Sequence, residues 1–107
     1  MDTGRPLNVV KAELFKGLAH PVRIRILELL SESEEVSVGQ LIEALRLEAS
    51  HVSQHLRVLR SYDLVTSERR ASQVYYRLAH ASVADMLAAA RTLLGEVLEH
   101  RAALLAD

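Results

Sequence analysis

The sequence predicts a mainly α-helical domain with one β-hairpin. Helix-forming Leu, Ala, Glu and Arg are frequent, whereas there are only four glycines and two prolines. Through most of the chain the apolar residues recur at spacings of three and four, which is typical of helices. Residues 73–78 instead alternate with a period of two, which is typical of a strand. Because 107 residues suffice for one hydrophobic core, we expect a single domain over 1–107.

The composition excludes several classes of protein. Apolar residues make up 50% of the chain and charged residues 25%, as in an ordinary globular domain. Cysteine is absent, which excludes disulfides, thiolate metal ligands and thiol-based redox switches. No stretch has the length of a membrane span or the pattern of a secretion signal. We therefore expect a cytoplasmic protein with no membrane partner.

The first part of the chain predicts a short arm and two helices. Residues 1–6 are expected to form a flexible arm. Apolar residues at helical spacing then predict a helix over 7–17, with Gly17 as its natural stop. His20 is expected to cap a second helix or to lie on its surface, because Pro21 follows it and proline is tolerated in the first helical turn.

The middle of the chain predicts a helix-turn-helix over 38–61. Ser37 is placed to cap a short third helix over 38–45, and a turn over 46–49 leads to a fourth helix over 50–61. The fourth helix has one apolar face and one polar face. Two short helices joined by a tight turn, the second with a polar outer face, form a helix-turn-helix.

Two predicted strands follow, over 64–68 and 73–78. Their connection, Arg69-Arg70-Ala71-Ser72, is short and basic, so the pair is a hairpin with a cationic tip. A hairpin next to a helix-turn-helix is a wing. The segment 64–78 therefore extends the predicted architecture to a winged helix-turn-helix.

The last predicted helix, over 82–105, is about 35 Å long. Its apolar face is too broad for so small a domain to cover. The surplus predicts pairing with a second copy of the chain, so we expect a homodimer whose dimerisation helices are 7–17 and 82–105.

Charge is segregated along the chain. The formal net charge is −1 overall. Between Arg46 and Arg77, however, there are six arginines and three acidic residues, which gives this segment a net charge of +3. The remainder of the chain carries seven basic and eleven acidic residues, a net charge of −4. A positive face on an acidic body is what attachment to double-stranded DNA requires.

The polar residues of the fourth helix and the wing are the candidate DNA contacts. The major groove admits one α-helix, whose side chains must exchange hydrogen bonds with base edges. The first turns of this helix carry such groups, and its later turns carry arginines. The wing tip carries two more arginines, which could contact phosphates or the minor groove. The predicted base-edge contacts are Ser50, His51, Ser53 and Gln54, and the predicted backbone or wing contacts are Arg57, Arg60, Arg69 and Arg70.

Three stretches of the chain resemble the ArsR family of bacterial and archaeal winged-helix repressors, many of which are metal sensors. They are Leu18-Ala19-His20-Pro21-Val22-Arg23, Val52-Ser53-Gln54-His55-Leu56-Arg57-Val58-Leu59-Arg60, and Leu64-Val65 followed by Val74-Tyr75-Tyr76-Arg77-Leu78. The resemblance implies four helices, then two strands and a last helix. It also implies a dimer built from the first and last helices, an inverted-repeat operator, and release of DNA when an effector binds. One departure is the wing tip, which lacks the glycine that members of the family often carry.

The resemblance also implies where an effector metal would bind. A family site that uses a cysteine pair falls on Ser37 and Gly39, which cannot replace the thiolates. A second family site falls near His80, Ser82, Leu93 and Glu96, where only two residues are good ligands.

The residues themselves offer a replacement set for Ni²⁺, Co²⁺ or Zn²⁺. Glu96, Glu99 and His100 share one helix face and could meet His80 or Asp85 of a partner chain. The candidate metal ligands are thus His80, Glu96, Glu99 and His100, with a merely solvated polar face as the alternative.

The function predicted from the sequence is that of a DNA-binding transcriptional repressor. Two alternatives remain open at this point: a regulator or activator without an effector, and a winged-helix module that binds protein. An enzyme is not expected, because the chain has no glycine-rich phosphate loop, no nucleophile elbow and no His-Glu-x-x-His pattern.

Overall fold

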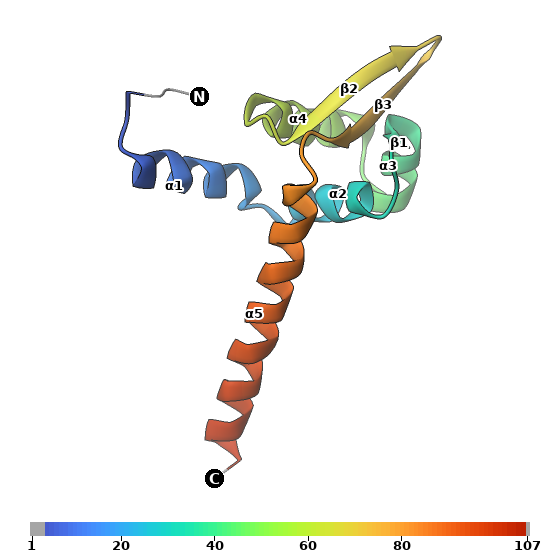
Figure 1. Cartoon of the computed structure of the whole chain (residues 1–107). Helices are drawn as coiled ribbons and strands as arrows, with labels where there is room; N and C mark the ends of the chain where they lie inside the picture. Colours follow the sequence, from blue (N-terminus) through green and yellow to red (C-terminus); the bar gives the residue numbers. More distant parts are fainter. Residues whose placement is uncertain (1–3, 107) are drawn as a thin grey trace.

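The computed structural model describes residues 4–106, which form five helices and a small three-stranded sheet (Figure 1). The mainly helical winged architecture is confirmed, with one strand added to the predicted order. The elements are α1 (Leu7–Leu18), α2 (Pro21–Ser31), β1 (Val36–Ser37), α3 (Val38–Leu45), α4 (Ala49–Ser61), β2 (Val65–Arg70), β3 (Gln73–Leu78) and α5 (Ser82–Leu105).

Gly17 is not the helix stop that the sequence predicted. Helix α1 continues to Leu18, and Gly17 is buried within its last turn. A Cβ atom at Gly17 would lie 2.7 Å from Cγ of Tyr62, a distance that side chains do not tolerate. The glycine is therefore needed for the close packing of α1 on the residue that follows α4, and helix termination plays no part in it.

The added strand, β1, lies next to β3 in the sheet order β1-β3-β2, and both pairings are antiparallel. Its second residue, Ser37, is the predicted cap of α3. The Ser37 hydroxyl accepts a hydrogen bond from the Gln40 backbone N–H at 3.1 Å, and the Gln40 side chain accepts one from the Ser37 N–H at 2.9 Å. Through this capping box, Ser37 is both the last residue of β1 and the cap of α3.

The hairpin is longer than the sequence predicted. Strand β2 runs to Arg70, so the connection is the two-residue turn Ala71–Ser72. Ala71 has a φ of 55°, at a position where tight hairpin turns usually carry glycine. As a result Arg69 and Arg70 belong to the strand, and successive side chains of a strand point to opposite faces of the sheet.

The core is aliphatic and lies between α2, α3, α4 and the base of the hairpin. Tyr76 is the one aromatic side chain among the buried core residues of the described segment. Each fully buried leucine or isoleucine contributes about 1.5–3 kcal/mol relative to exposure. The side chains with under 2% exposure are Ile26, Leu27 and Leu30 of α2, Leu41 of α3, and Val52, Leu56 and Leu59 of α4.

Helix α5 projects away from this core (Figure 1). Its first turns are packed, since Val83 is buried and Leu87 lies against the core. Every residue over 88–106 is exposed, and the radius of gyration is 16.2 Å, against about 13 Å for a compact domain of this length. We call residues 20–87 the body and residues 88–105 the shaft. No helix in the described part of the chain is long and apolar enough to cross a membrane.

The expected flexible arm, 1–6, lies partly outside the described residues. In the described part, Arg5 forms a two-bond ion pair with Glu13 of α1, with Nη2 donating to Oε2 at 2.9 Å. The hydrogen bond from Arg5 lowers the pKa of the Glu13 carboxyl. Arg5 therefore ties the chain before α1 back onto that helix.

Candidate nucleic-acid interface

Helix α4 separates a buried face from a polar, exposed face. Val52, Leu56 and Leu59 are almost completely buried and anchor the helix to the core. This burial leaves the opposite side chains free to contact a ligand in solution. All six candidate residues of this helix are exposed: Ser50, His51, Ser53, Gln54, Arg57 and Arg60.

A groove of about 1350 Å³ lies between the helix-turn-helix and the wing. It is lined by Ser53, Arg57 and Arg60 from α4 and by residues of α3 and β3. The structure thus brings three of the candidate residues together with polar groups that the sequence analysis did not single out. These additional lining residues include Gln40, Ser72, Gln73 and Tyr75.

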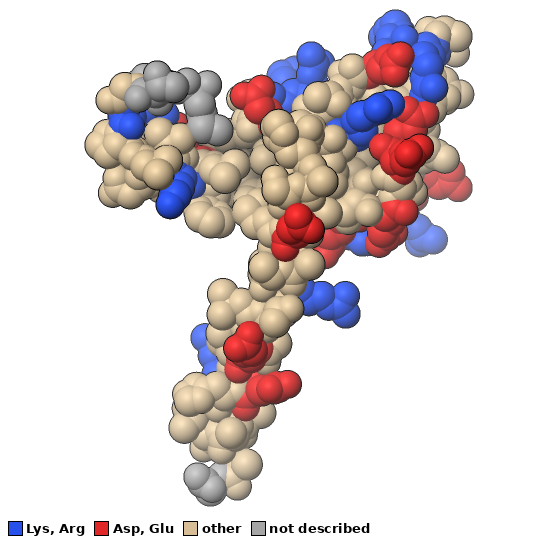
Figure 2. All heavy atoms as spheres, viewed as in Figure 1, with Lys and Arg blue, Asp and Glu red and all other residues tan. Residues whose placement is uncertain are grey.

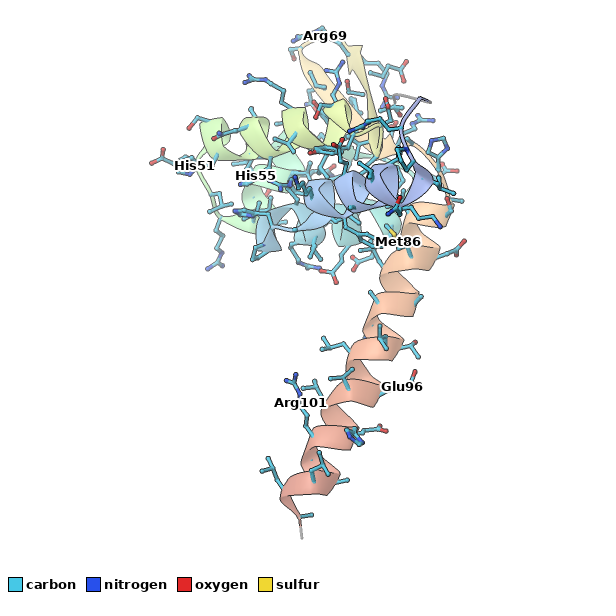
Figure 3. All side chains as sticks on the ribbon, turned by 90° about the vertical axis from the view of Figure 1, so that its left-hand side faces the viewer. His51, His55, Arg69, Met86, Glu96 and Arg101 are labelled. Carbon is cyan, nitrogen blue, oxygen red and sulfur yellow. The ribbon has the colours of Figure 1, made fainter. Side chains whose placement is uncertain are left out.

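The two candidate arginines of the wing have different surroundings. Arg69 lies at the end of the hairpin in Figure 3 and pairs across the strands with Val74. Within the described residues it has no ion-pair partner. Arg70 lies over the ring of Tyr75, 3.9 Å from the centroid, and its guanidinium donates to the carboxylate of Glu35. Arg69 is therefore the better placed of the two for a DNA phosphate.

Glu35 forms ion pairs with the wing that the sequence analysis did not predict. It precedes β1, and its second oxygen accepts a hydrogen bond from Arg77 at 3.2 Å. The hydrogen bond from Arg70 is the main cause that lowers the pKa of the Glu35 carboxyl, and the same bond raises the pKa of Arg70. Figure 2 shows the resulting mixture of basic and acidic side chains over the hairpin. Glu35 thus neutralises part of the positive charge that the sequence predicted for the wing.

The two histidines of α4 point in different directions. His51 points away from the body in Figure 3, whereas His55 is half-buried and faces α2. The ring of His55 lies 4.3 Å from that of His20, centroid to centroid. His20 itself caps α2, since its Nδ1 accepts a hydrogen bond from the Val22 N–H at 3.1 Å. His51 is thus available to a ligand, and His55 belongs to the junction with α2.

The candidate metal ligands are not gathered within one chain. His80 precedes α5 and lies about 24 Å along the helix axis from Glu96. Over residues 4–106 no three His, Asp or Glu side chains form a group that could hold a metal ion. At about 100° per residue, Glu96 and Glu99 also lie on the opposite side of α5 from Leu94. Only a second chain could complete such a site.

Comparison with known proteins identifies the family. The model of the bacterial regulatory proteins of the arsR family matches residues 20–67, which include the helix-turn-helix. The uncharacterized HTH-type transcriptional regulator Rv0081 of Mycobacterium tuberculosis is 48% identical over 103 residues, 95% of this chain and 90% of that protein. The chain belongs to the ArsR family. This ArsR-family protein is a DNA-binding transcriptional regulator and not an enzyme.

Solved structures and a further relative agree with this assignment. The crystal structure of M. tuberculosis Rv0081 matches with a TM-score of 0.84 at 46% identity, covering 92% of this chain and 98% of that one. The homodimeric winged helix-turn-helix domain of Mb0332 from Mycobacterium bovis matches with a TM-score of 0.80 at 32% identity, covering 94% and 92%. The HTH-type transcriptional repressor SmtB of M. tuberculosis is 42% identical over 84 residues, 78% of this chain and 62% of that protein.

Proposed function

We propose that this ArsR-family regulator binds an inverted-repeat operator as a homodimer and represses transcription by occupying a promoter. The main observation behind this proposal is the exposed polar face of α4. It lies next to the groove, whose other side is formed by the wing. Ser50, Ser53 and Gln54 supply hydrogen bonds for base edges in the major groove. Arg57, Arg60 and Arg69 supply charge for the phosphates.

The homodimer is supported by apolar side chains that one chain leaves uncovered. Leu94 and Leu98 of the shaft are 57% and 53% exposed, and Phe15 of α1 is 59% exposed. Large apolar patches on soluble proteins mark interaction surfaces. The related M. bovis domain is homodimeric. A two-fold dimer would present two copies of α4 to two half-sites, about one DNA turn or a multiple apart.

Repression is supported by the likeness to SmtB, which is named a repressor. Binding to a bacterial promoter would place the protein in the cytoplasm.

Control by Ni²⁺, Co²⁺ or Zn²⁺ would use a site shared by two chains. Its ligands would be His80, Glu96, Glu99 and His100, all exposed on or just before α5. Because Glu96 and Glu99 lie on the opposite side of α5 from Leu94, the partner chain would have to contact that side of the helix to complete the site. An ion there would change DNA affinity by altering the angle between the two bodies.

The first test is fluorescence anisotropy of the purified protein on its own upstream DNA, with scrambled DNA of equal length as control. Gln54→Ala should weaken binding to the specific duplex by about 1–3 kcal/mol, as loss of a base contact does. Binding to scrambled DNA should not change. Ser31→Ala is the control, because the Ser31 hydroxyl donates to the backbone oxygen of Glu28 within α2 and Ser31 is not among the residues that line the groove. Equal binding of Gln54→Ala and the unmodified protein would contradict the proposed placement of α4.

The same titration tests metal control. It is run first in chelator and then with Ni²⁺, Co²⁺ and Zn²⁺. A metal that changes the affinity about tenfold corresponds to about 1.4 kcal/mol of coupling between the two sites. Glu96→Ala and His100→Ala should abolish that change. Tight binding that no metal alters would instead support a regulator without a metal effector.

A further inference from the structure

Arg23 joins three elements at the point where α1 ends. Its Nε donates to the backbone oxygen of Gly17 at 2.7 Å, and its Nη2 donates to that of Lys16 at 3.2 Å. The last carbonyls of a helix have no partner within the helix and form the negative end of its dipole. A guanidinium of α2 therefore caps α1 and holds its last turn.

The same guanidinium faces the DNA-contacting helix. Nη1 of Arg23 lies 3.5 Å from Nδ1 of His55, at the outer limit of a hydrogen bond. The other neighbour of His55 is the ring of His20, which is held in place by its bond to the start of α2. In Figure 3 His55 lies between α4 and the end of α1. The start of α2 thus connects α1 to the middle of α4.

A second contact joins the same two helices further along. Tyr62, directly after α4, packs on Gly17 so closely that a Cβ atom at position 17 would force the tyrosine ring to move. The last turn of α1 is consequently fixed against α4 at two places, through Arg23 and through Tyr62. Both contacts hold the Lys16–Gly17 turn of α1, and they connect it to α4 at His55 and at the residue that follows the helix.

We propose that Arg23 and His55 are positioning residues that fix α4 relative to α1 and thereby determine which half-site spacing the dimer recognises, an inference that rests on the homodimer proposed above. Helix α1 exposes Leu7 and Phe15, which are available to a partner chain. Because α1 meets the partner on one side and α4 on the other, the junction sets the separation and angle of the two copies of α4. Neither residue needs to touch a base for this role.

The chain offers matched variants for the test. Arg23→Met removes all three donors but keeps much of the side-chain volume. His55→Leu removes the acceptor, whereas His55→Asn retains an acceptor near the Nδ1 position. Arg25→Met is the control, because Arg25 lies on the same helix and, among residues 4–106, forms only an exposed ion pair with Glu28 at 3.6 Å.

The test measures the affinity of full-length dimers for palindromic duplexes that carry two copies of the half-site protected in the upstream DNA. The spacer is kept at its natural length or changed by about two base pairs in either direction. The unmodified protein, Arg25→Met and His55→Asn should prefer the natural spacing. Arg23→Met and His55→Leu should reduce that preference by about tenfold, while their affinity for a single half-site and their dimerisation by ultracentrifugation stay unchanged.

The outcomes separate the two proposals. If the unmodified protein shows no spacing preference, the inverted-repeat homodimer is wrong, and the positioning role fails with it. If the unmodified protein has the preference and both Arg23→Met and His55→Leu keep it, only the positioning role is overturned. An equal loss of affinity for every duplex, together with a lower Tm, would make the junction merely structural and would also overturn it. If Arg23→Met does not fold, the spacing preference of His55→Leu alone tests the positioning role.

Discussion

The body and the shaft contain similar apolar side chains, but one chain covers only those of the body. Leu56 in α4 is 1% exposed, whereas Leu94 and Leu98 in the shaft are 57% and 53% exposed. Leucine is equally apolar in both places, so the difference lies in what surrounds it. One chain covers the apolar side chains of the body, whereas it leaves those of the shaft exposed.

The two ends of the molecule also differ in charge. The hairpin carries arginines and acids in ion pairs, whereas the basic and acidic side chains visible on the shaft in Figure 2 form no ion pair within residues 4–106. On the shaft, Glu96 and Arg101 point in opposite directions (Figure 3). Arg101 therefore lies on the same side of the helix as Leu94 and interrupts the apolar face of the shaft with a basic side chain.

The largest effect is expected for a leucine in the body. Leu56→Ala should lower the free energy of unfolding by about 2–5 kcal/mol, because it opens a cavity in a packed core. Leu94→Ala, the same change in the shaft, should have an effect that depends on protein concentration, because its cost appears only in the dimer. Urea unfolding at two protein concentrations measures both. If Leu94→Ala lowers the free energy of unfolding by the same amount at low and high protein concentration, the shaft is already packed within one chain.

The next largest effect concerns the pairing of shafts. Leu94→Asp combined with Leu98→Asp should abolish the dimer and weaken binding to an inverted repeat by at least about a hundredfold, roughly 2.7 kcal/mol. The body should keep its circular dichroism spectrum and its affinity for a single half-site. Thr92→Asp, on the opposite side of the helix, is the control. A dimer that survives the double change would place the interface elsewhere.

A smaller difference is expected within the wing. Arg69→Ala should reduce the slope of log affinity against log salt by about 0.9, the contribution of one phosphate contact. Arg70→Ala should reduce it by less, because the Arg70 guanidinium is already paired with Glu35. Anisotropy titrations at several salt concentrations give both slopes. Equal slopes for the two variants would mean that DNA displaces Glu35 from Arg70.

The smallest effect expected is a pH dependence within the body. Burial is the main cause that lowers the pKa of His55, and electrostatic repulsion from His20, Arg23 and His51 lowers that pKa further. The unfolded chain therefore binds this proton more readily than the folded one. The stability from neutral His55 is complete above about pH 6.5 and is lost as the pH falls through the lower folded pKa.

His55→Asn cannot take up that proton. Its stability should decline less than that of the unmodified protein between about pH 7.5 and pH 5, measured by urea unfolding. Parallel curves for the two proteins would show that His55 titrates alike in the folded and unfolded chains.

Much of the fold could be predicted because its signals are local. The period of the apolar residues located all five helices, and strict alternation located β3 at its observed bounds of 73–78. Ser37 was correctly identified as a cap, because its position just before an apolar run is itself a local pattern. The polar face of α4 could likewise be predicted from the sequence, because the buried positions of a helix leave a fixed set of residues on its other side.

The chain by itself therefore determined the winged helix-turn-helix, the candidate DNA contacts of α4 and the surplus apolar surface of α5. Only the tertiary structure decided which arginine of the wing is paired, why Gly17 is a glycine, and how α1 is held against α4. Each of these depends on contacts between distant residues: Glu35 is 35 positions from Arg70, and Arg23 is 32 positions from His55. Periodicity reports which way a side chain faces along its own helix or strand. The partner that it meets there is set by how the elements pack together.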